Sequence, residues 1–323
     1  MKSMDYRPCG TSGLLLPRLS LGLWQAFGAS CTQEHLGKMI RTAFDAGICS
    51  FDLADNYGPP PGQAEAHFGG WFSREFSAHR DEVILSTKAG HLMWDGPYGD
   101  GGSRKHLMAG IDQSLRRLKV DYVDLFYHHR PDPKTPEEES WQALVDIVRA
   151  GKALYVGLSK YSPEALARAV TFFRAQHTPF ILHQVRYNLL CRDVEKESLA
   201  VAAQEGLGVS VFSVLAQGLL TEKYLTTIPQ DSRIATGSLF LTEKSLTEDY
   251  RQRIIRLRDL VRPAGYSVPA FALRWALRRS EITTAIIGAS RPEQICDNVS
   301  ALSLPEPSAD LYLAAEQLLE SHL

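Results

Sequence analysis

The sequence predicts an α/β protein built as one (β/α)8 TIM barrel, residues 1–323, with an N-terminal β-hairpin that caps the barrel. Two observations support this fold class: eight short apolar runs recur along the chain, and helix-like segments lie between successive runs. Strands that are apolar on both faces, each followed by a helix, require a parallel sheet covered by helices, and eight such units can close into a barrel. No linker or change of composition divides the sequence, so we expect one domain.

The eight candidate strands have the length and the aliphatic character of buried strands. In chain order they are LSLGL at 19, SFDLA at 50, VILSTK at 83, YVDLFYHH at 122, ALYVGLS at 153, ILHQVRY at 181, VSVFSV at 209 and TTAIIGA at 283.

Four segments between these strands have apolar residues at helical spacing and Ser, Thr or Pro at their starts. They are TQEHLGKMIRTAFDAG at 32, SRKHLMAGIDQSLRRL at 103, TPEEESWQALVDIVRAG at 135 and SPEALARAVTFFRAQ at 162. The opening RPCGTSGLLLPRLS is typical of a small hairpin at the bottom of the barrel. The irregular stretch 221–247 follows the seventh strand and is interpreted as an active-site loop.

The composition favours small-molecule chemistry. Hydrophobic residues at 44% and charged residues at 22% exclude a disordered or collagen-like chain. The 35 basic and 37 acidic residues form no long basic run, so the electrostatic footprint of a nucleic-acid-binding protein is missing. The start MKSMDYRPCGTSG lacks the apolar core of a signal peptide, and no apolar run approaches the ~20 residues that span a bilayer. We therefore expect a cytoplasmic protein without a membrane partner.

The cysteines argue against a disulfide framework and against a metal site. There are five, an odd number, and they lie far apart without a C-x-x-C pattern. We interpret them as small buried or surface thiols, and we expect no metal ion.

Polar residues collect where the predicted strands end. Barrel enzymes place their chemistry there, because the C-terminal ends of the strands and the loops after them form the open mouth. A mouth lined all round with ionisable and hydrogen-bonding groups favours an active site. These residues are Asp52 with Tyr57 beyond it, Lys88, His128, His129, Ser159, Gln184 and Ser213.

Two adjacent histidines, His128 and His129, end the fourth predicted strand. Side chains alternate faces along a strand, so one face carries His129 and the other carries Asp124 and His128. If His128 faced the lumen, Asp124 would point into the packed barrel interior, where an unpaired carboxylate is costly. We therefore predict that His129 faces the lumen and that His128 faces the helical shell or a loop.

Four of the polar residues suit the protonation of a carbonyl oxygen if they converge. Tyr57 is a poor acid at neutral pH, but the Lys88 ammonium would favour its phenolate and lower the pKa of about 10. Asp52 would fix the position of Lys88, and His129 would donate a hydrogen bond to the substrate oxygen. Carbonyl reduction also needs a hydride, which no side chain supplies, so a nicotinamide cofactor is implied.

The usual dinucleotide fingerprint G-x-G-x-x-G is absent from the sequence. A phosphate site is expected instead after the eighth strand, in IIGASRPEQICDN, where Ser290 would cap a helix and Glu293 would complete an S-x-x-E capping box. Arg291 lies in the first turn, and Lys223 and Arg233 come from the long loop. Free N–H groups, the helix dipole and these cations favour phosphate binding.

Long motifs resemble the aldo-keto reductase superfamily over nearly the whole chain: FDLADNYG, STKAG, DLFYHHRPD, GLSKYSPE, FSVLAQGLLTEKY and IIGASRPEQ. Within that superfamily, SLGLW, NYGPPPGQAE, KAGHLMWDGPYGDGGSRK and GKALYVGLS resemble the bacterial L-glyceraldehyde 3-phosphate reductases, which are related to the β subunits of potassium channels.

The resemblance implies an NADPH-dependent reductase whose catalytic tetrad falls on Asp52, Tyr57, Lys88 and His129. It also implies that Gln184 holds the nicotinamide carboxamide and that Arg233 and Arg291 hold phosphates. The full set of implied cofactor contacts is Leu23, Trp24, Ser159, Lys160, Gln184, Phe212, Ser213, Val214, Leu215, Ala216, Gln217, Lys223, Arg233, Gly288, Ser290, Arg291, Gln294 and Asn298.

The sequence departs from the superfamily at three places. Relatives usually carry proline where Val214 stands and glycine where Glu222 stands, and His128 is unusual at its position. The first two changes fall in the stretch that would wrap the pyrophosphate. Relatives often assemble as tetramers or octamers, so a homo-oligomer is expected.

The favoured hypothesis is reduction of small aldehydes or ketones, for instance L-glyceraldehyde 3-phosphate, methylglyoxal or aromatic aldehydes. Candidate substrate contacts are Trp24, Tyr57, Trp94, Tyr98 and Arg130. The alternative is an NADP(H)-binding regulatory subunit with vestigial turnover, but channel β subunits carry asparagine where His129 stands. A serine hydrolase fails, because the sequence GLSKY around Ser159 lacks the final glycine of G-x-S-x-G.

Overall fold

Eight parallel strands close into a barrel in the structure, a computed structural model that describes residues 4–230, 232, 234–235 and 241–320. Neighbouring strands pair in the closed order β10-β3-β4-β5-β6-β7-β8-β9, so all eight sequence-predicted strands are confirmed. Their bounds are β3 (Leu19–Gly22), β4 (Ser50–Asp52), β5 (Ile84–Ala89), β6 (Val123–His128), β7 (Ala153–Ser159), β8 (Phe180–Arg186), β9 (Gly208–Phe212) and β10 (Ile282–Ile287).

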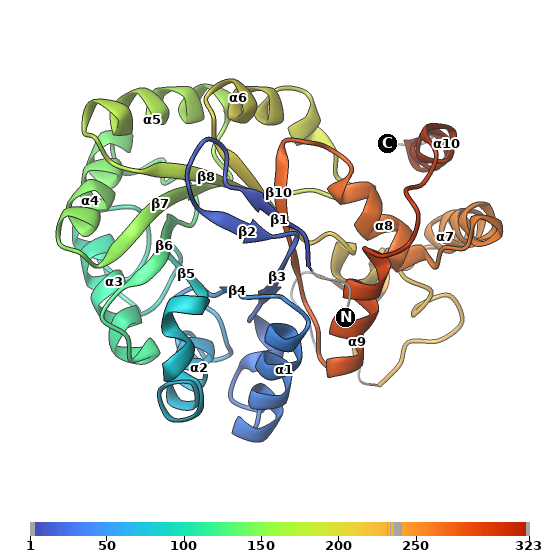
Figure 1. Ribbon diagram of the computed structural model, residues 1–323, viewed down its shortest axis with the longest axis horizontal. Coiled ribbons are helices and arrows are strands. Elements are labelled where there is room, and N and C mark those ends of the chain that lie inside the picture. Colours follow the sequence, from blue (N-terminus) through green and yellow to red (C-terminus); the bar gives the residue numbers. More distant parts are fainter. Residues whose placement is uncertain (1–3, 231, 233, 236–240, 321–323) are drawn as a thin grey trace.

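Helices surround the barrel, and α7 and α10 lie outside α8 (Figure 1). Thr32, Ser103 and Ser162 each accept a hydrogen bond from the backbone N–H three residues later, which explains why three of the four predicted helices begin where they do. The bounds are α1 (Gln33–Asp45), α2 (Gln63–Glu75), α3 (Arg104–Leu118), α4 (Glu137–Arg149), α5 (Pro163–Ala175), α6 (Ser198–Gln204), α7 (Glu248–Val261), α8 (Val268–Leu277), α9 (Pro292–Ala301) and α10 (Ala309–Glu320).

An antiparallel hairpin of β1 (Tyr6–Pro8) and β2 (Leu15–Pro17) covers one end of the barrel, as the sequence predicts (Figure 1). Its turn is fixed to the segment before β9, because the backbone N–H of Thr11 donates to the carbonyl of Gly206 at 2.9 Å. Gly10 has φ +58°, and a Cβ there would lie 2.0 Å from the Gly206 oxygen. This close approach requires glycine.

The register of β6 decides which side chains enter the barrel. Leu125 and Tyr127 pack in the interior cluster with the hairpin, whereas Phe126 packs in the cluster beneath the helices. Asp124 also faces outward, where its Oδ2 lies 2.9 Å from Nη1 of Arg80. The prediction that Asp124 lies on the outward face of β6, and not in the barrel interior, is therefore confirmed.

The barrel interior is polar below the mouth. A cavity of about 10 Å³ lies there, enough for one water molecule at most. Six of its lining residues carry a hydroxyl group, namely Ser20, Ser50, Ser86, Tyr127, Ser210 and Thr284. They extend the polar character of the strand ends down to the level of Asp52, which also lines the cavity.

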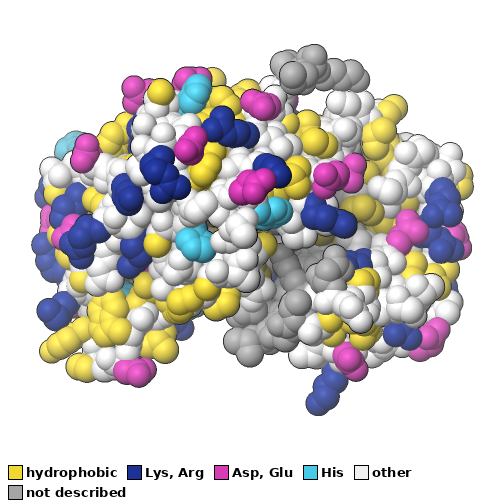
Figure 2. All heavy atoms as spheres, turned by 90° about the horizontal axis from the view of Figure 1, so that it is seen from below, with side chains coloured by type: hydrophobic (Ala, Val, Ile, Leu, Met, Phe, Trp, Pro, Cys, Tyr) yellow, Lys and Arg dark blue, Asp and Glu magenta, His cyan; other side chains and the backbone are white. Residues whose placement is uncertain are grey.

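Charges of both signs are interspersed on the face that Figure 2 shows. This agrees with the near balance of 35 basic and 37 acidic residues. Among the described residues, every helix is too short or too polar to cross a bilayer.

Candidate active site

Asp52 and Lys88 form a buried ion pair at the mouth of the barrel. Asp52 is the last residue of β4 and Lys88 lies in the neighbouring β5. The Lys88 Nζ atom lies 2.6 Å from Asp52 Oδ2 and 2.6 Å from the carbonyl oxygen of Leu53. The other carboxylate oxygen, Oδ1, accepts from Ser86 at 2.9 Å and from Gln184 at 3.1 Å. Four hydrogen bonds therefore hold both charged groups in one position.

Tyr57 lies in the turn after β4, where its backbone N–H donates to the Ala54 carbonyl at 3.0 Å. Its ring centre is 5.0 Å from the Lys88 ammonium, 5.8 Å from the His129 ring and 6.3 Å from the Trp24 ring. The structure thus brings together the four residues expected to form a tetrad.

The expected lowering of the Tyr57 pKa is wrong. Burial raises the pKa of Tyr57 well above its usual value, and the negative charges of Asp52 and Asp55 raise it further. Lys88 does not offset this, because its ammonium is directed at the Asp52 carboxylate and at a backbone carbonyl. Tyr57 is therefore a protonated phenol at neutral pH, and a proton donor needs that state.

His129 follows β6 directly, and its backbone N–H donates to the Ala89 carbonyl at 2.9 Å. Its ring lies between Tyr57 and His91, whose ring centre is 4.5 Å away in an edge-to-face arrangement. Burial lowers the pKa of His129 well below its usual value, and the charge of Lys88 lowers it further. A neutral imidazole keeps one N–H, so His129 retains a donor for a substrate oxygen.

His91 is a residue of the mouth that the sequence analysis missed. The available signal was its position just after the STKAG strand, at the same edge as His129. Burial, with smaller contributions from the positive charges of Lys160 and Arg130, lowers the pKa of His91 to about 4. Like His129, it is neutral at physiological pH.

His128 faces away from the lumen, as predicted. Its Nδ1 lies 2.7 Å from the Tyr161 hydroxyl, and its ring packs beneath Gly102. Burial lowers its pKa to about 4. His128 thus joins the wall of the barrel to the loop before α3.

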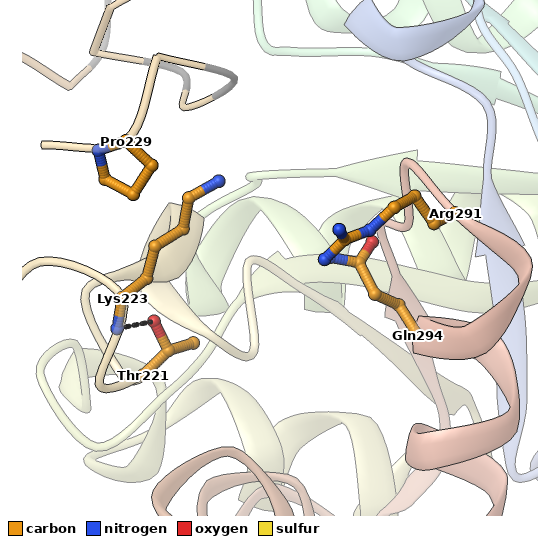
Figure 3. Close-up of a pocket in the computed structure, with 5 residues that line it drawn as sticks. All are labelled: Thr221, Lys223, Pro229, Arg291 and Gln294. Carbon is orange, nitrogen blue, oxygen red and sulfur yellow. Dashed lines mark hydrogen bonds between the residues drawn. The ribbon is translucent and has the colours of Figure 1, made fainter.

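A pocket of about 400 Å³ lies beside the mouth between the long segment after β9 and the start of α9. Figure 3 shows the Lys223 side chain extending into it from one side and the ends of Arg291 and Gln294 from the other. Thr221 and Pro229 complete the lining. This combination of two cations and an amide fits a phosphate-bearing ligand. Arg233, the third expected cation, lies outside the described residues.

The predicted capping box at this site is wrong. Helix α9 begins at Pro292, and Arg291 is the N-cap residue without a side-chain cap. Gln294 rather than Glu293 reaches back, because its Oε1 accepts from the Ser290 backbone N–H at 2.8 Å. The proline at the first helical position shifts the helix start by one residue relative to the S-x-x-E reading. Asn298 on the same helix is buried, and Gly288 directly follows β10.

The segment after β9 has an unusual backbone. Ser213, Ala216 and Gln217 all have φ between +46° and +60°, a region that non-glycine residues rarely adopt. Such conformations cluster at ligand clamps. Leu215 and Gln217 are partly buried, whereas Val214 is buried where relatives usually have proline. Phe212, another expected cofactor contact, is the last residue of β9 and directly precedes this segment.

Ser159 Oγ at the end of β7 and Gln217 Oε1 in the segment after β9 are buried and have no hydrogen-bond partner among the described residues. A bound ligand would satisfy such atoms. Gln184, by contrast, already donates to Asp52 Oδ1, so its amide is only partly available for a carboxamide. Leu23 is buried, and its backbone N–H donates to the Asp52 carbonyl at 2.9 Å.

The expected substrate contacts are divided. Trp24 lies beside Tyr57. Trp94 and Tyr98 instead contact residues of α3, with the Trp94 ring 5.5 Å from His106 and the Tyr98 ring 5.1 Å from the Lys105 ammonium. The expected contact Arg130 donates to the Gly90 carbonyl at 2.9 Å and to Asp100 at 2.7 Å. These bonds leave Arg130 at the edge of the mouth.

The fold and the tetrad define a barrel enzyme whose mouth suits proton transfer to a bound oxygen. The sequence pattern of the aldo/keto reductase family matches residues 18–317, and the chain belongs to this family. It is an oxidoreductase of that family, as the resemblance of its motifs implied.

Two groups of named proteins are similar to the chain. It is 51% identical over 304 residues to the L-glyceraldehyde 3-phosphate reductase of Escherichia coli K12, covering 93% of this chain and 88% of that protein. It is 36% identical over 307 residues to a probable voltage-gated potassium channel subunit beta of Oryza sativa, covering 93% of this chain and 92% of that protein. The corresponding protein of Arabidopsis thaliana is 34% identical over 307 residues, with the same coverage of the two chains.

Proposed function

We propose that the protein reduces small aldehydes or ketones to alcohols, with NADPH as the hydride donor and Tyr57 as the proton donor. The observation that carries this proposal is the convergence of Tyr57, Lys88 and His129 on one point of the mouth, with Asp52 buried beneath them. L-glyceraldehyde 3-phosphate is a candidate substrate, because the Escherichia coli relative is named for it.

Each residue of the tetrad has a separate task in this proposal. His129 is neutral and donates a hydrogen bond to the carbonyl oxygen, which orients the substrate and polarises it. Tyr57 then gives its proton to that oxygen. Its raised pKa is no obstacle, because an alkoxide is far more basic than a phenolate. Lys88 presents a positive charge to the Tyr57 ring, and Asp52 holds Lys88 in place.

The residues of the pocket fit a phosphorylated dinucleotide. NADPH would supply the hydride when bound. Lys223 and Arg291 offer positive charge, and Gln294 and Thr221 offer polar groups, in a space of about 400 Å³. Glu222, whose charge was a concern beside a phosphate, lies 3.3 Å from Arg262, which offsets it. We expect NADPH to be preferred to NADH, because the positive charges of the pocket suit the additional phosphate group of NADPH.

The alternative function is an NADP(H)-binding regulatory subunit, and the similarity to probable channel β subunits favours it. His129 argues against a purely regulatory role, because a nucleotide-binding module needs no neutral donor beside a partly buried tyrosine. We also propose a cytoplasmic location and a homo-oligomeric state, both by analogy with the family.

The test is turnover by the purified protein with NADPH and a panel of aldehydes and ketones, followed by loss of NADPH absorbance and by detection of the alcohol. Alcohol formed in equal amount to the NADPH consumed supports the proposal. Tight NADPH binding with no alcohol from any carbonyl would support the regulatory subunit instead.

A further inference from the structure

The turn after β5 brings His91 against the histidine pair at the end of β6. Gly90 makes this turn with φ +135°, a conformation that L side chains rarely adopt. A Cβ on Gly90 would lie 3.1 Å from Cδ2 of His128 and 3.5 Å from the backbone nitrogen of His129. The chain therefore passes close enough to β6 for the next residue, His91, to reach the His129 side chain.

Arg130 fixes the same turn from the neighbouring strand. Its Nε atom donates to the Gly90 carbonyl at 2.9 Å, and its Nη2 atom donates to Asp100 at 2.7 Å. Two points of the loop that carries His91 are thus bonded to the residue that follows His129. These bonds hold His91 in place relative to His129.

The two imidazole rings meet edge to face. Their centres are 4.5 Å apart and their planes are inclined by 87°, an arrangement that aromatic rings prefer to a face-to-face sandwich. The Tyr57 ring meets the same His129 imidazole at 5.8 Å and 73°. Two rings that stand at steep angles to the His129 imidazole restrict its rotation.

One nitrogen of His129 is enclosed. Its Nδ1 atom is buried and has no hydrogen-bond partner among the described residues, whereas Nε2 is not one of the buried atoms without a partner. A neutral imidazole carries a single N–H, and on Nδ1 that N–H would be a buried donor without an acceptor, which is costly. The packing therefore favours the proton on Nε2, as long as water does not enter beside Nδ1.

We propose that His91 is a positioning residue: its ring fixes the orientation of the His129 imidazole and keeps water from Nδ1, so that Nε2 carries the N–H that the carbonyl oxygen accepts. This inference rests on the proposed function. Among the described residues, the His91 side chain contacts His129 through its ring and forms no hydrogen bond. The contact therefore depends on the ring of His91 and not on its nitrogens.

The kinetic test is a double-mutant cycle of His91→Ala, His129→Ala and the double variant, measured as kcat/KM for one aldehyde. His91→Ala alone should lower kcat/KM by about 10–10², because displacement of a catalytic group by about 1 Å costs up to about 10² in rate. In the His129→Ala background the same replacement should cost less than about twofold, because the group that His91 positions is gone. His91→Phe keeps a ring against His129 and should retain kcat/KM within about threefold of the wild type.

A spectroscopic readout separates positioning from a general loss of stability. Nitrogen-15 NMR of labelled histidines reports which ring nitrogen carries the proton, and His129→Ala assigns the His129 signals among the ten histidines of the chain. Wild type and His91→Phe should show the Nε2–H form of His129. His91→Ala should show exchange between the two tautomers, because water then reaches Nδ1.

The matched control is His79→Ala, which removes a half-buried histidine from the turn Ser77–Glu82 before β5. The His79 ring also lies 4.5 Å from an aromatic ring, that of Phe76, but away from the mouth. This variant should lower Tm and leave both kcat/KM and the His129 signals unchanged.

Equal losses from His91→Ala with and without His129 would overturn the inference, as would an Nδ1–H form of His129 in the wild type. A His91→Phe variant as impaired as His91→Ala would also overturn it, because the nitrogens of His91 would then contact the substrate themselves. A wild-type protein that binds NADPH and reduces no aldehyde would instead overturn the proposed function. The NMR spectra, recorded without substrate, would still test the contact between the two histidines.

Discussion

Nδ1 of His128 lies 2.7 Å from the hydroxyl of Tyr161, on the outer face of the barrel wall beneath the helices. The next residue, His129, lies against Tyr57 and His91 inside the mouth. Two consecutive histidines thus take part in different structures, one joining β6 to the segment after β7 and the other lining the candidate active site.

Replacing each histidine should therefore have a different effect. His129→Ala should lower kcat/KM by about 10²–10⁴ with little change in Tm, because it removes a positioned donor. His128→Ala should lower stability by about 1–3 kcal/mol, because it leaves the Tyr161 hydroxyl buried without its partner. The measurements are kcat/KM and Tm for both variants with one aldehyde. Loss of turnover in His128→Ala alone would contradict this assignment.

A buried carboxyl group behind the tetrad gives a prediction about pH and stability. Asp55 has no solvent exposure, and both of its oxygens lack a hydrogen-bond partner among the described residues. Nearby Glu65 is also fully buried, but it binds Thr87 at 2.5 Å and Arg117 at 2.7 Å. Burial, and then the negative charge of Glu65, raise the pKa of Asp55 well above its usual value. Asp55 is therefore the protonated member of the pair.

The sign of the effect follows from linkage. In the unfolded chain Asp55 ionises near its usual pKa of about 4, whereas the folded protein holds its proton to higher pH. At acid pH the Asp55 carboxyl is protonated in both states and does not oppose folding. As the pH rises towards the pKa of Asp55 in the folded protein, the free energy of unfolding therefore falls. Asp55→Asn should remove this loss, so its Tm should exceed that of the wild type by an amount that grows as the pH rises above about 4, the pKa of the unfolded carboxyl group. Asp45→Asn, at the exposed end of α1, is the matched control. Parallel Tm curves for wild type and Asp55→Asn would show that Asp55 is ionised in the fold.

The cationic pocket predicts how the cofactors are discriminated. Arg291→Ala should raise the Kd for NADPH about tenfold and the Kd for NADH much less, because only NADPH carries the extra phosphate. Arg256→Ala, on an exposed part of α7, is the control. Fluorescence titration of each variant with both cofactors gives the comparison. Equal loss of affinity for NADPH and NADH would place Arg291 on the pyrophosphate instead.

The sequence was sufficient for the barrel, which depends on local signals, and for the strand ends at which Asp52, Lys88 and His129 lie. Apolar strands and capped helices are short-range patterns, and Thr32, Ser103 and Ser162 begin their helices as their side chains dictate. The prediction that His129 faces the lumen was based on the alternation of side chains along the strand. It succeeded because β6 is regular and because Asp124 pairs with Arg80 on the outward face.

The remaining features depend on contacts between distant segments, which short-range patterns do not contain. The link between Gln184 and Asp52 joins residues 132 positions apart, and it takes up an amide that was assigned to the cofactor. Arg130 was expected to meet a substrate, but Asp100, 30 positions away, takes one end of its guanidinium. At α9 the proline after Arg291 moved the helix start and replaced the expected cap. The pKa of Tyr57 depends on burial, which no spacing of residues reveals.

The central claim is that Tyr57 gives the proton in a reduction driven by NADPH, and Tyr57→Phe tests it most directly. Tyr122→Phe, a tyrosine beside Arg80 away from the mouth, is the matched control. The measurement is kcat for one good aldehyde together with the NADPH Kd, for wild type and both variants. The account predicts that Tyr57→Phe keeps the NADPH Kd within about twofold and loses about 10²–10⁴ in kcat, while Tyr122→Phe keeps both. Near-normal kcat in Tyr57→Phe would contradict it.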